Sequence, residues 1–340
     1  MNVIIPMAGI GSRLRPITPI TPKPLISLVG KTIIYRIIAE LYQYTDIKKI
    51  GFILQQENND IEKNLKQIVL KKFDKKIDIT FFYQTNAKGT AHAIYCAKKL
   101  LKGKVLIIFS DTLFFLKKAI NFHDLDKLDG AIFVKKVEDP SSYGVVKKNK
   151  LGLIIDFVEK PNTLISKLAM IGVYYFKESE NLENEIKKII KNNITEKNEF
   201  QLTTALKNLM NNNKKFTTIE VKDWLDCGTH DNLIATSKYL MSQQIKHKET
   251  DFQHKLINSN IIEPVYLGNN VVIKNSTIGP NVSIENDSVI ENSSIDNSIL
   301  QQKVTLINAT ISNSIIGKCA EYNGKSKSII IGPYSNLNRA

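Results

Sequence analysis

The sequence predicts an α/β domain with a mostly parallel sheet and helices on both faces, followed by a left-handed parallel β-helix. Two patterns support this fold class. In the first part of the chain, short apolar runs alternate with stretches that carry apolar residues at helical spacing, as in a parallel sheet covered by helices. Toward the C-terminus, aliphatic residues recur every five or six positions between Asn, Ser and Gly, which indicates a hexapeptide-repeat solenoid.

A glycine-containing loop follows the first predicted strand, which is the apolar run Val3–Ile5. Gly9 and Gly11 allow a tight turn and let backbone N–H groups approach an anion, and Ser12 and Arg13 follow them. An arginine fork also suits phosphate oxygens. We therefore predict that this loop binds a triphosphate, with an ordinary turn as the alternative. The spacing excludes a P-loop, and the third glycine of a dinucleotide-binding turn is missing.

Lys23 lies between Pro22 and Pro24 in the same N-terminal region. The two prolines restrict the backbone around the lysine, which favours a fixed position for its charge. We predict that Lys23 and Arg13 are the catalytic residues and that they neutralise phosphate charge. A solvated loop lysine is the alternative.

The other elements of the first domain follow from the spacing of apolar residues. The predicted strands are 50–54, 79–83, 105–109, 131–135, 144–147, 154–158, 170–176 and 217–221. The predicted helices are 33–44, 61–69, 182–191, 199–210, 231–244 and one that begins near Thr90. Ligands of open α/β sheets bind at the carboxyl ends of the strands, so polar residues after strands are the candidate site residues.

One such polar stretch follows strand 79–83 and begins with Gln84. The Gln84 amide offers a donor and an acceptor for a nucleobase edge, and Gly89 permits a close approach of the backbone to the base. For Gln84, an exposed polar residue at a strand end is the alternative. The predicted nucleotide-binding residues are Gly9, Gly11, Ser12, Gln84, Gly89 and Thr90.

Two aspartates follow probable strand ends: Asp111 comes after strand 105–109, and Asp226 stands beside the turn at Gly228. Two carboxylates together with substrate phosphates are the usual way in which proteins hold Mg²⁺. We predict that Asp111 and Asp226 bind Mg²⁺, although each alone is more often a turn or cap residue.

Glu159 and Lys160 follow strand 154–158. The carboxylate can accept hydrogen bonds from sugar hydroxyls and the lysine can meet a phosphate, with a solvated ion pair as the alternative. Gly144 and Gly172 mark positions at which the backbone is approached closely.

The composition describes a globular chain of 340 residues with 43% hydrophobic residues, long enough for two domains. We see no signal peptide and no membrane span, and the three cysteines, an odd number at wide spacing, argue for the cytoplasm. The net charge is +14, but only four basic residues are arginines and the lysines are scattered. We therefore expect neither a nucleic-acid nor a membrane partner.

The solenoid pattern sets the predicted domain boundaries: a catalytic domain at 1–240, a linker at 241–260 and the β-helix at 261–335. The five-residue steps indicate irregular coils. The recurring aliphatic residues are Leu267, Ile273, Ile278, Ile284, Ile290, Ile295, Leu300, Leu306, Ile311 and Ile316.

With these residues in place, the chain resembles the sugar-1-phosphate nucleotidyltransferases. It is most similar to bacterial glucose-1-phosphate thymidylyltransferase-like proteins that carry a C-terminal hexapeptide-repeat domain. The resemblance covers nearly the whole chain. The motifs that carry it are AGIGSRLRPIT and TPKPL within 8–25, KGTAHA at 88–93, SDT at 110–112, YGVV at 143–146, VEKP at 158–161 and WLDCGT at 224–229.

The resemblance implies a Rossmann-like catalytic domain and assigns roles to the residues named above. The phosphate-binding residues would be Gly9, Gly11, Ser12, Arg13 and Lys23, and the base-binding residues Gln84, Gly89 and Thr90. The metal would be held by Asp111 and Asp226, and the sugar phosphate by Tyr143, Gly144, Glu159, Lys160 and Gly172.

The implied reaction joins a nucleoside triphosphate and a sugar-1-phosphate into a nucleoside-diphosphate sugar and pyrophosphate. Glucose-1-phosphate thymidylyltransferase is the first expectation, with dTTP or UTP as the nucleotide. Mannose-1-phosphate guanylyltransferase and N-acetylglucosamine-1-phosphate uridylyltransferase are alternatives, because GTAHA also resembles uridylyltransferases. A sugar-nucleotide-binding regulatory subunit is the non-enzyme alternative, and a homo-oligomer is left open.

Overall fold

The computed structural model describes residues 1–9, 11–73, 76–244, 254–324 and 328–338. The chain forms two compact units. Unit 1 consists of Met1–Gly9 and Ile37–Trp224, and unit 2 consists of Ile10–Arg36 and Leu225–Ala340. The N-terminal region is therefore divided between the two units just after Gly9, which the sequence pattern does not predict.

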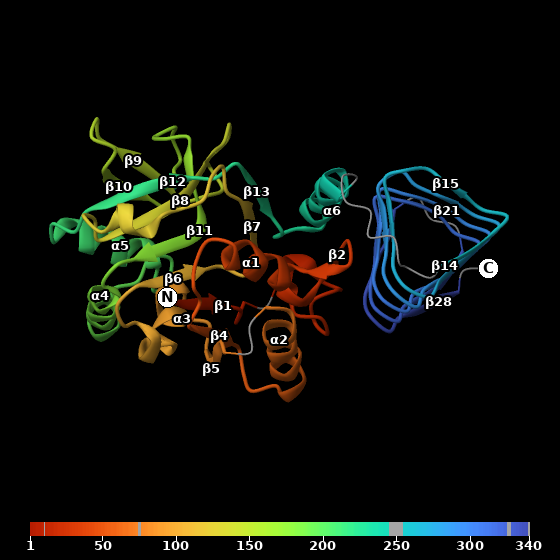
Figure 1. Ribbon diagram of the computed structural model, residues 1–340, viewed down its shortest axis with the longest axis horizontal. Coiled ribbons are helices and arrows are strands. Elements are labelled where there is room, and N and C mark those ends of the chain that lie inside the picture. Colours follow the sequence, from red (N-terminus) through yellow and green to blue (C-terminus); the bar gives the residue numbers. More distant parts are fainter. Residues whose placement is uncertain (10, 74–75, 245–253, 325–327, 339–340) are drawn as a thin grey trace. The chain divides into compact units, whose positions relative to one another are not determined.

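Unit 1 is built on a mixed sheet in which seven strands follow the order β10-β9-β11-β6-β1-β4-β5, and β8 pairs with β11 and β12 (Figure 1). The strands are β1 (Asn2–Pro6), β4 (Lys49–Leu54), β5 (Asp78–Tyr83), β6 (Val105–Ile108), β8 (Gly130–Lys136), β9 (Val145–Lys148), β10 (Ile154–Val158), β11 (Leu168–Phe176) and β12 (Phe216–Glu220). Parallel pairing of β6, β1, β4 and β5 confirms the predicted alternation. Strand β11, however, runs antiparallel to β6, β8 and β9, so the second half of the sheet is mixed.

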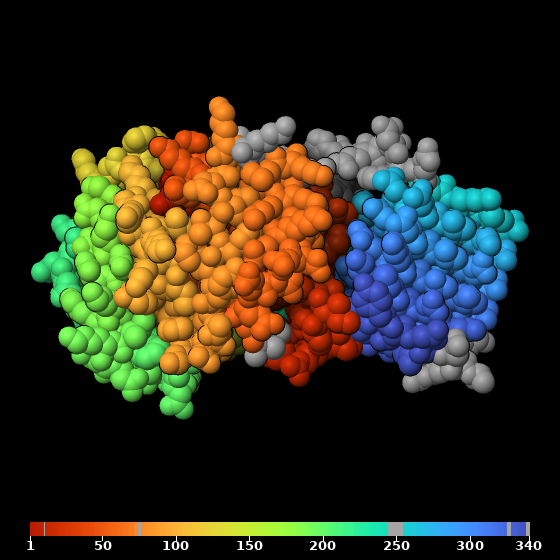
Figure 2. Space-filling view, turned by 90° about the horizontal axis from the view of Figure 1, so that it is seen from below, coloured from red at the N-terminus to blue at the C-terminus, as the bar shows by residue number. Residues whose placement is uncertain are grey.

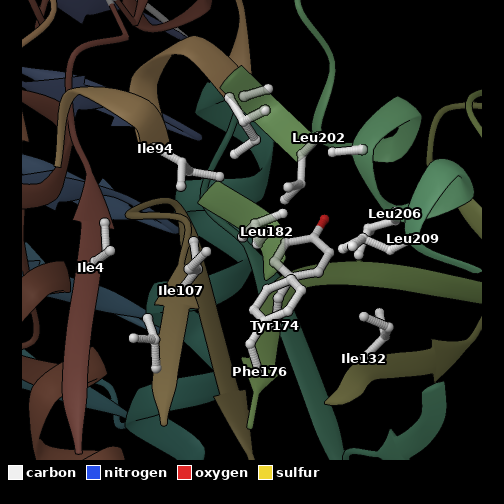
Figure 3. Close-up of a cluster of buried hydrophobic side chains, with 14 of the residues drawn as sticks. Ile4, Ile94, Ile107, Ile132, Tyr174, Phe176, Leu182, Leu202, Leu206 and Leu209 are labelled. Atoms are coloured by element: carbon white, nitrogen blue, oxygen red, sulfur yellow. The ribbon is translucent and has the colours of Figure 1, made fainter. Parts of the chain in front are cut away.

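The main core of unit 1 lies between this sheet and the helices α3 (Thr90–Cys96), α4 (Ser179–Lys191) and α5 (Leu202–Asn211). Figure 3 shows the rings of Tyr174 and Phe176 among aliphatic side chains that include Leu206 and Leu209 of α5. Full burial of one such aliphatic side chain stabilises the fold by roughly 1.5–3 kcal/mol. This core fixes β11 and β6, from which two of the candidate site loops extend.

Strand alternation gives the sheet a second apolar face. Ile53 of β4 belongs to the core described above, whereas its neighbour Phe52 points to the other face and stacks on Phe81, with ring centroids 5.9 Å apart. Lys66 of α2 (Asn59–Lys72) lies over the Phe81 ring at 5.3 Å, so α2 covers this face. Helices on both faces of the sheet agree with the predicted fold class.

Some boundaries differ from those predicted. Helix α5 begins at Leu202 rather than at 199, because Phe200 is hydrogen-bonded through its backbone to Lys88 and Ala91. Strand β6 ends at Ile108, and Asp111 lies in the turn before a strand the prediction lacked, β7 (Thr112–Phe115). Asp226 is the last residue of β13 (Asp223–Asp226).

Unit 2 contains the predicted solenoid, whose strands stack in parallel into three sheets with the orders β14-β17-β20-β23-β26-β28, β15-β18-β21-β24 and β16-β19-β22-β25-β27. The recurring aliphatic residues from Ile273 to Ile316 are buried in its interior, and Leu267 packs against them. The coils follow one another as the colour changes from cyan to blue in Figures 1 and 2. The left-handed β-helix is confirmed.

The strands of the solenoid are short and are bounded as follows: β14 (His254–Ile257), β15 (Asn260–Ile261), β16 (Val265–Leu267), β17 (Val271–Lys274), β18 (Thr277–Ile278), β19 (Val282–Ile284), β20 (Val289–Glu291), β21 (Ser294–Asp296), β22 (Ile299–Leu300), β23 (Thr305–Ile307), β24 (Thr310–Ser312), β25 (Ile315–Ile316), β26 (Glu321–Asn323), β27 (Ile330–Ile331) and β28 (Asn336–Asn338).

Asparagines turn the corners of the coils. Asn275, Asn292 and Asn308 adopt positive φ, a conformation that asparagine tolerates better than most residues. Their side chains form a ladder with Asn323 in which successive members are 17, 16 and 15 residues apart. The coils therefore differ in length, which explains why the aliphatic residues recur in steps of both five and six residues.

Residues 241–244 of the predicted linker 241–260 end helix α6 (His230–Gln244), and β14 begins at His254. Residues 245–253 lie outside the described part of the chain. The assignment of 241–260 as a linker therefore stays a prediction.

The N-terminal part of unit 2 consists of two 3₁₀ turns, Ser12–Leu14 and Lys23–Leu25, and a small antiparallel hairpin. The hairpin strands are β2 (Ser27–Leu28) and β3 (Lys31–Thr32). Helix α1 (Ile33–Tyr42) follows directly and is capped by Thr32, because Tyr35 N donates to Thr32 Oγ1 at 3.2 Å.

Candidate functional site

Unit 1 holds the stretch predicted to bind the base. Gln84 is only 6% exposed, and its amide Nε2 donates to Gly89 O at 3.1 Å and lies 3.0 Å from His92 Nδ1. Burial lowers the pKa of His92, and the charge of Lys88 lowers it further, which favours a neutral imidazole beside this amide. Gln84 is therefore anchored inside the loop rather than exposed at a strand end.

Gly89 is required for packing within the protein. Its φ is +101°, and a Cβ at this position would lie 2.6 Å from Phe200 O and 2.7 Å from Phe200 N. Thr90 Oγ1 accepts a hydrogen bond from Leu202 N at 2.9 Å and thereby caps α5. The close approach that the sequence suggested for Gly89 is thus to Phe200, a residue that the sequence reasoning did not connect with the loop.

We expect Gly89→Ala to destabilise the protein by about 2–4 kcal/mol, because the strained φ and the collision with Phe200 act together. The matched control is Gly152→Ala, where φ is +79° and nothing lies within 4 Å of the added Cβ. This control should cost about 1 kcal/mol, the cost of the positive φ alone. Urea unfolding measures both, and equal losses for the two variants would contradict the packing role of Gly89.

The turn that carries Asp111 is held by a bulge in β11. The register of β11 against β8 shifts between Met170 and Tyr174, and Gly172 lies in this bulge with a φ of +82°. Phe109 N donates to Gly172 O at 2.9 Å, and Thr112 Oγ1 donates to Ile171 O at 2.7 Å. The bulge therefore fixes the residues on both sides of Asp111, as bulges next to functional sites often do.

The residues predicted to bind the sugar phosphate come together from neighbouring strands. Glu159 Oε2 would lie 2.9 Å from a Cβ on Gly144, so the carboxylate covers this glycine. Lys160 N donates to Tyr143 O at 3.2 Å, and Gly144 O accepts from Met170 N at 2.7 Å. The Tyr143 ring meets the Trp224 ring edge-on, with centroids 4.8 Å apart.

Glu159 and Asp111 both influence the buried hydroxyl of Tyr174. Burial raises the pKa of Glu159, and the nearby Lys160 only partly opposes this shift. The pKa of the buried Tyr174 hydroxyl is raised strongly, first by burial and then by the negative charges of Glu159 and Asp111. The predicted metal residue and the predicted sugar residue thus both lie within electrostatic reach of the Tyr174 hydroxyl.

Unit 2 carries Arg13 and Lys23, the two predicted catalytic residues. Gly11 has a φ of +63° and begins the turn Ser12–Leu14, and Thr18 Oγ1 donates to Gly11 O at 2.8 Å. Arg13 is exposed within this turn. Thr18 is a residue that the sequence reasoning missed, although it belongs to the motif AGIGSRLRPIT.

Gly9 belongs to unit 1 and is exposed, with nothing within 4 Å of a Cβ built on it. Ile10, which separates it from Gly11, lies outside the described residues. Lys23 is half-buried and opens the turn Lys23–Leu25, with Pro22 as its N-cap and Pro24 buried inside it. The two prolines thus start a short helical turn around the lysine.

Asp226 also belongs to unit 2, where Asn232 of α6 donates to its Oδ2 at 3.2 Å. A Cβ on Gly228 would lie 2.8 Å from Asp226 Oδ1, so the glycine leaves room for the carboxylate. Across the described residues, no three His, Cys, Asp or Glu side chains gather as a metal-binding group. A site made of two carboxylates would therefore need substrate oxygens to complete it.

A model of the family described as nucleotidyl transferase matches residues 2–243. The chain belongs to the nucleotidyl transferase family. The family resemblance inferred from the motifs is therefore confirmed.

Curated relatives of this chain include bifunctional GlmU proteins of Methanococcus and Methanocaldococcus species. The protein of Methanococcus vannielii is 29% identical over 282 residues, which cover 81% of this chain and 61% of that protein. The protein of Methanocaldococcus jannaschii is 31% identical over 245 residues, with coverages of 72% and 55%. The mannose-1-phosphate guanylyltransferase catalytic subunit beta of Drosophila melanogaster is 32% identical over 183 residues, with coverages of 52% and 48%. The chain spans between about half and three fifths of the length of these relatives.

Among solved structures, UDP-glucose pyrophosphorylase complexed with UDP-glucose matches with a TM-score of 0.59 at 23% identity, covering 71% of this chain and 98% of that chain. This likeness concerns the fold alone and confirms the Rossmann-like α/β class. None of these relatives is named a thymidylyltransferase, so the first expectation for the substrate gives way to its alternatives. No helix among the described residues is both long and apolar enough to cross a membrane.

Proposed function

We propose that this nucleotidyltransferase transfers a nucleotidyl group from a nucleoside triphosphate to a sugar-1-phosphate and releases pyrophosphate. The observation that carries this proposal is the arrangement in unit 1, where one β11 bulge holds the Asp111 turn and the Glu159 carboxylate lies over Gly144. A carboxylate over a glycine backbone suits the hydroxyl groups of a sugar. Family membership supports the same reaction.

In this proposal, the sugar-phosphate oxygen attacks the α-phosphorus of the nucleotide, and the bond from this phosphorus to the pyrophosphate oxygen breaks in line. Tyr143, Gly144, Glu159, Lys160 and Gly172 orient the attacking sugar phosphate. The loop with Gly9, Gly11 and Ser12 holds the triphosphate. Arg13 and Lys23 neutralise charge that moves toward the leaving pyrophosphate, so positioning and charge stabilisation supply most of the rate.

Asp111 and Asp226 have the donor chemistry for Mg²⁺. Each is half-buried beside a glycine or a bulge, and the hydrogen bond from Asn232 orients the Asp226 carboxylate, as partners of metal ligands commonly do. Mg²⁺ would supply neutralisation of phosphate charge and would need the two carboxylates together with phosphate oxygens as ligands. These residues therefore fit the ion.

Gln84 limits the choice of base. Its Nε2 is already engaged by Gly89 O and His92, so Oε1, an acceptor, is the atom that it offers to a base. An acceptor matches the ring N–H of uracil, thymine or guanine, whereas adenine and cytosine present an acceptor at that position. Together with the GlmU relatives, this favours UTP with N-acetylglucosamine-1-phosphate, with GTP and mannose-1-phosphate as the second candidate.

The test is a matrix of the five nucleotides UTP, dTTP, GTP, ATP and CTP against three sugar-1-phosphates, scored by pyrophosphate release. We expect UTP with N-acetylglucosamine-1-phosphate to give the highest kcat/KM, and ATP and CTP to be at least about tenfold poorer for every sugar. A preference for ATP would contradict the assignment of Gln84. The best rate with GTP and mannose-1-phosphate would replace uridylyl by guanylyl transfer, and no pyrophosphate with any pair would favour a regulatory subunit.

Acetyl transfer is not part of the proposal, although relatives are named bifunctional. An acetyltransferase commonly uses a histidine as general base, and among the described strands of the solenoid the one histidine is His254, the exposed first residue of β14. Acetyl-CoA consumption with glucosamine-1-phosphate, measured beside the matrix, should stay at background.

A further inference from the structure

The hairpin β2–β3 links the turn that contains Lys23 to helix α1, and all its residues belong to the same compact unit as the β-helix. Its two-residue loop is Val29-Gly30, with φ values of 53° and 77°. A left-handed valine is strained, because its branched side chain crowds the backbone. Such a conformation persists only where surrounding contacts hold it.

The β-helix supplies those contacts from two neighbouring coils. Gln301, which follows β22, accepts from Ser27 N at 3.3 Å through Oε1 and donates from Nε2 to Ser27 O at 2.9 Å. Glu285, which follows β19, accepts from Gly30 N at 2.9 Å. Both side chains are buried, with exposures of 6% and 2%. The side chains of Gln301 and Glu285 therefore satisfy hydrogen-bonding groups of the hairpin backbone, as a neighbouring strand would do.

The position that Glu285 and Gln301 occupy recurs in each coil, and the residue type at this position changes with the contact to the N-terminal segment. Backbone hydrogen bonds one residue beyond each strand align positions 268, 285, 301, 317 and 332 in one column. The column contains Gly268, Glu285, Gln301, Gly317 and Gly332. In this column only Glu285 and Gln301 carry long polar side chains, and both bind the hairpin, whereas a Cβ on Gly332 would lie 2.9 Å from Pro16 O. The residues of this column therefore match the segment 16–30: two bind it by hydrogen bonds, and Gly332 leaves room for Pro16.

The guanidinium group of Arg36 also holds the hairpin. Arg36 of α1 donates through one guanidinium nitrogen to Leu28 O at 2.7 Å and to Val29 O at 2.9 Å. Burial lowers the pKa of Arg36 to about 10, and the charge of Glu285 opposes this shift, so the side chain stays protonated at neutral pH. Glu285 and Arg36 therefore each bind backbone groups of the hairpin, at Gly30 N and at the carbonyls of Leu28 and Val29.

We propose that Gln301 and Glu285 of the β-helix are positioning residues for nucleotidyl transfer, which hold the hairpin β2–β3 and thereby the Lys23 turn in the geometry for the transition state. The inference rests on the proposed role of Lys23. It gives the β-helix a part in the chemistry that passes through backbone contacts rather than through a ligand of its own.

The test uses the full chain and the substrate pair that the matrix selects. Gln301→Met keeps the volume of the side chain and removes both hydrogen bonds to Ser27. We expect kcat to fall about tenfold with KM values within about twofold of wild type, since a small misplacement of a catalytic group acts on the transition state. The matched control is Gln302→Met, which makes the same change at the neighbouring position and should keep wild-type kcat. Should Gln301→Met not fold, Gln301→Asn, one methylene shorter, replaces it with the same expectation.

A double-mutant cycle with Lys23→Ala separates positioning from a general structural loss. If Gln301 acts through Lys23, the double variant should have the kcat of Lys23→Ala alone within about twofold. A further tenfold fall in the Lys23→Ala background, or wild-type kcat for Gln301→Met, would overturn the inference.

Hydrogen exchange of the peptide 23–32 gives a readout that is independent of activity. Exchange should accelerate in Gln301→Met and not in Gln302→Met, and unchanged exchange in both would overturn the anchoring itself. If Lys23→Ala alone leaves kcat unchanged while exchange follows expectation, the proposed role of Lys23 is the part that fails.

Discussion

Asp226→Asn is expected to lower turnover by more than about a hundredfold while the protein stays folded. The substitution removes the carboxylate charge that Mg²⁺ requires, and loss even of a group that only orients a metal ligand costs ~10–100-fold at metal sites. The asparagine oxygen can still accept the hydrogen bond from Asn232, so the end of β13 and its contact with α6 are preserved. Steady-state pyrophosphate release as a function of Mg²⁺ concentration measures the effect.

Asp223→Asn is the matched control for this prediction. Asp223 begins the same strand, and its carboxylate lies 4.0 Å from Lys135 Nζ in a partly exposed ion pair that contributes little to stability. This variant should retain wild-type turnover and the wild-type requirement for Mg²⁺. Wild-type turnover of Asp226→Asn at saturating Mg²⁺ would remove Asp226 from the metal site.

The solenoid was predictable from the sequence because its physics is local and repeated. Each coil buries one aliphatic residue per face, so the period of five or six residues directly records the three-sided cross-section. Ile273, Ile290 and Leu306, for example, are 0% exposed and stack in one sheet. The corner asparagines follow from the same geometry, because many corners place a residue at positive φ.

The mixed half of the sheet was not predictable to the same degree. The apolar run 170–176 predicts a buried strand, but its direction depends on partners far away in the sequence. β11 pairs antiparallel with β6, and the glycine in its bulge gives no sign of this in the sequence pattern. Periodicity reports burial, whereas the direction of a strand is decided by tertiary contacts.

The candidate site, too, could be predicted from the sequence only in part. Residue chemistry identified Glu159 and Gly144 separately, and the structure places the carboxylate over the glycine. Gly89 was predicted to approach a nucleobase, and the structure shows that it packs against Phe200, whose backbone pairs with Lys88 and Ala91. Contacts of this kind join segments more than a hundred residues apart, so no short motif contains them.

Lys23→Ala is expected to lower kcat and kcat/KM together, by on the order of a hundredfold, with KM nearly unchanged. In the proposed reaction, Lys23 meets charge that grows on the leaving pyrophosphate, and removal of one such preorganised group typically costs ~10²–10³-fold in kcat. Its backbone sits in the turn Lys23–Leu25, which is closed by hydrogen bonds from Leu25 N to Pro22 O at 2.8 Å and from Ile26 N to Lys23 O at 3.1 Å. Truncation of the side chain leaves these bonds intact, so the loss measures the ammonium group rather than the fold.

Lys31→Ala provides the comparison within the same segment. Lys31 is half-buried like Lys23, but its ammonium lies 5.5 Å from the Tyr35 ring centroid, at the beginning of α1. The proposed reaction gives this lysine no part, so its loss should leave kcat within about twofold of wild type. A rise in KM for the nucleotide with unchanged kcat in Lys23→Ala would show that Lys23 binds ground state and transition state equally. Charge stabilisation of the leaving group would then have to come from Arg13, and Arg13→Ala should show the fall in kcat that Lys23→Ala lacked.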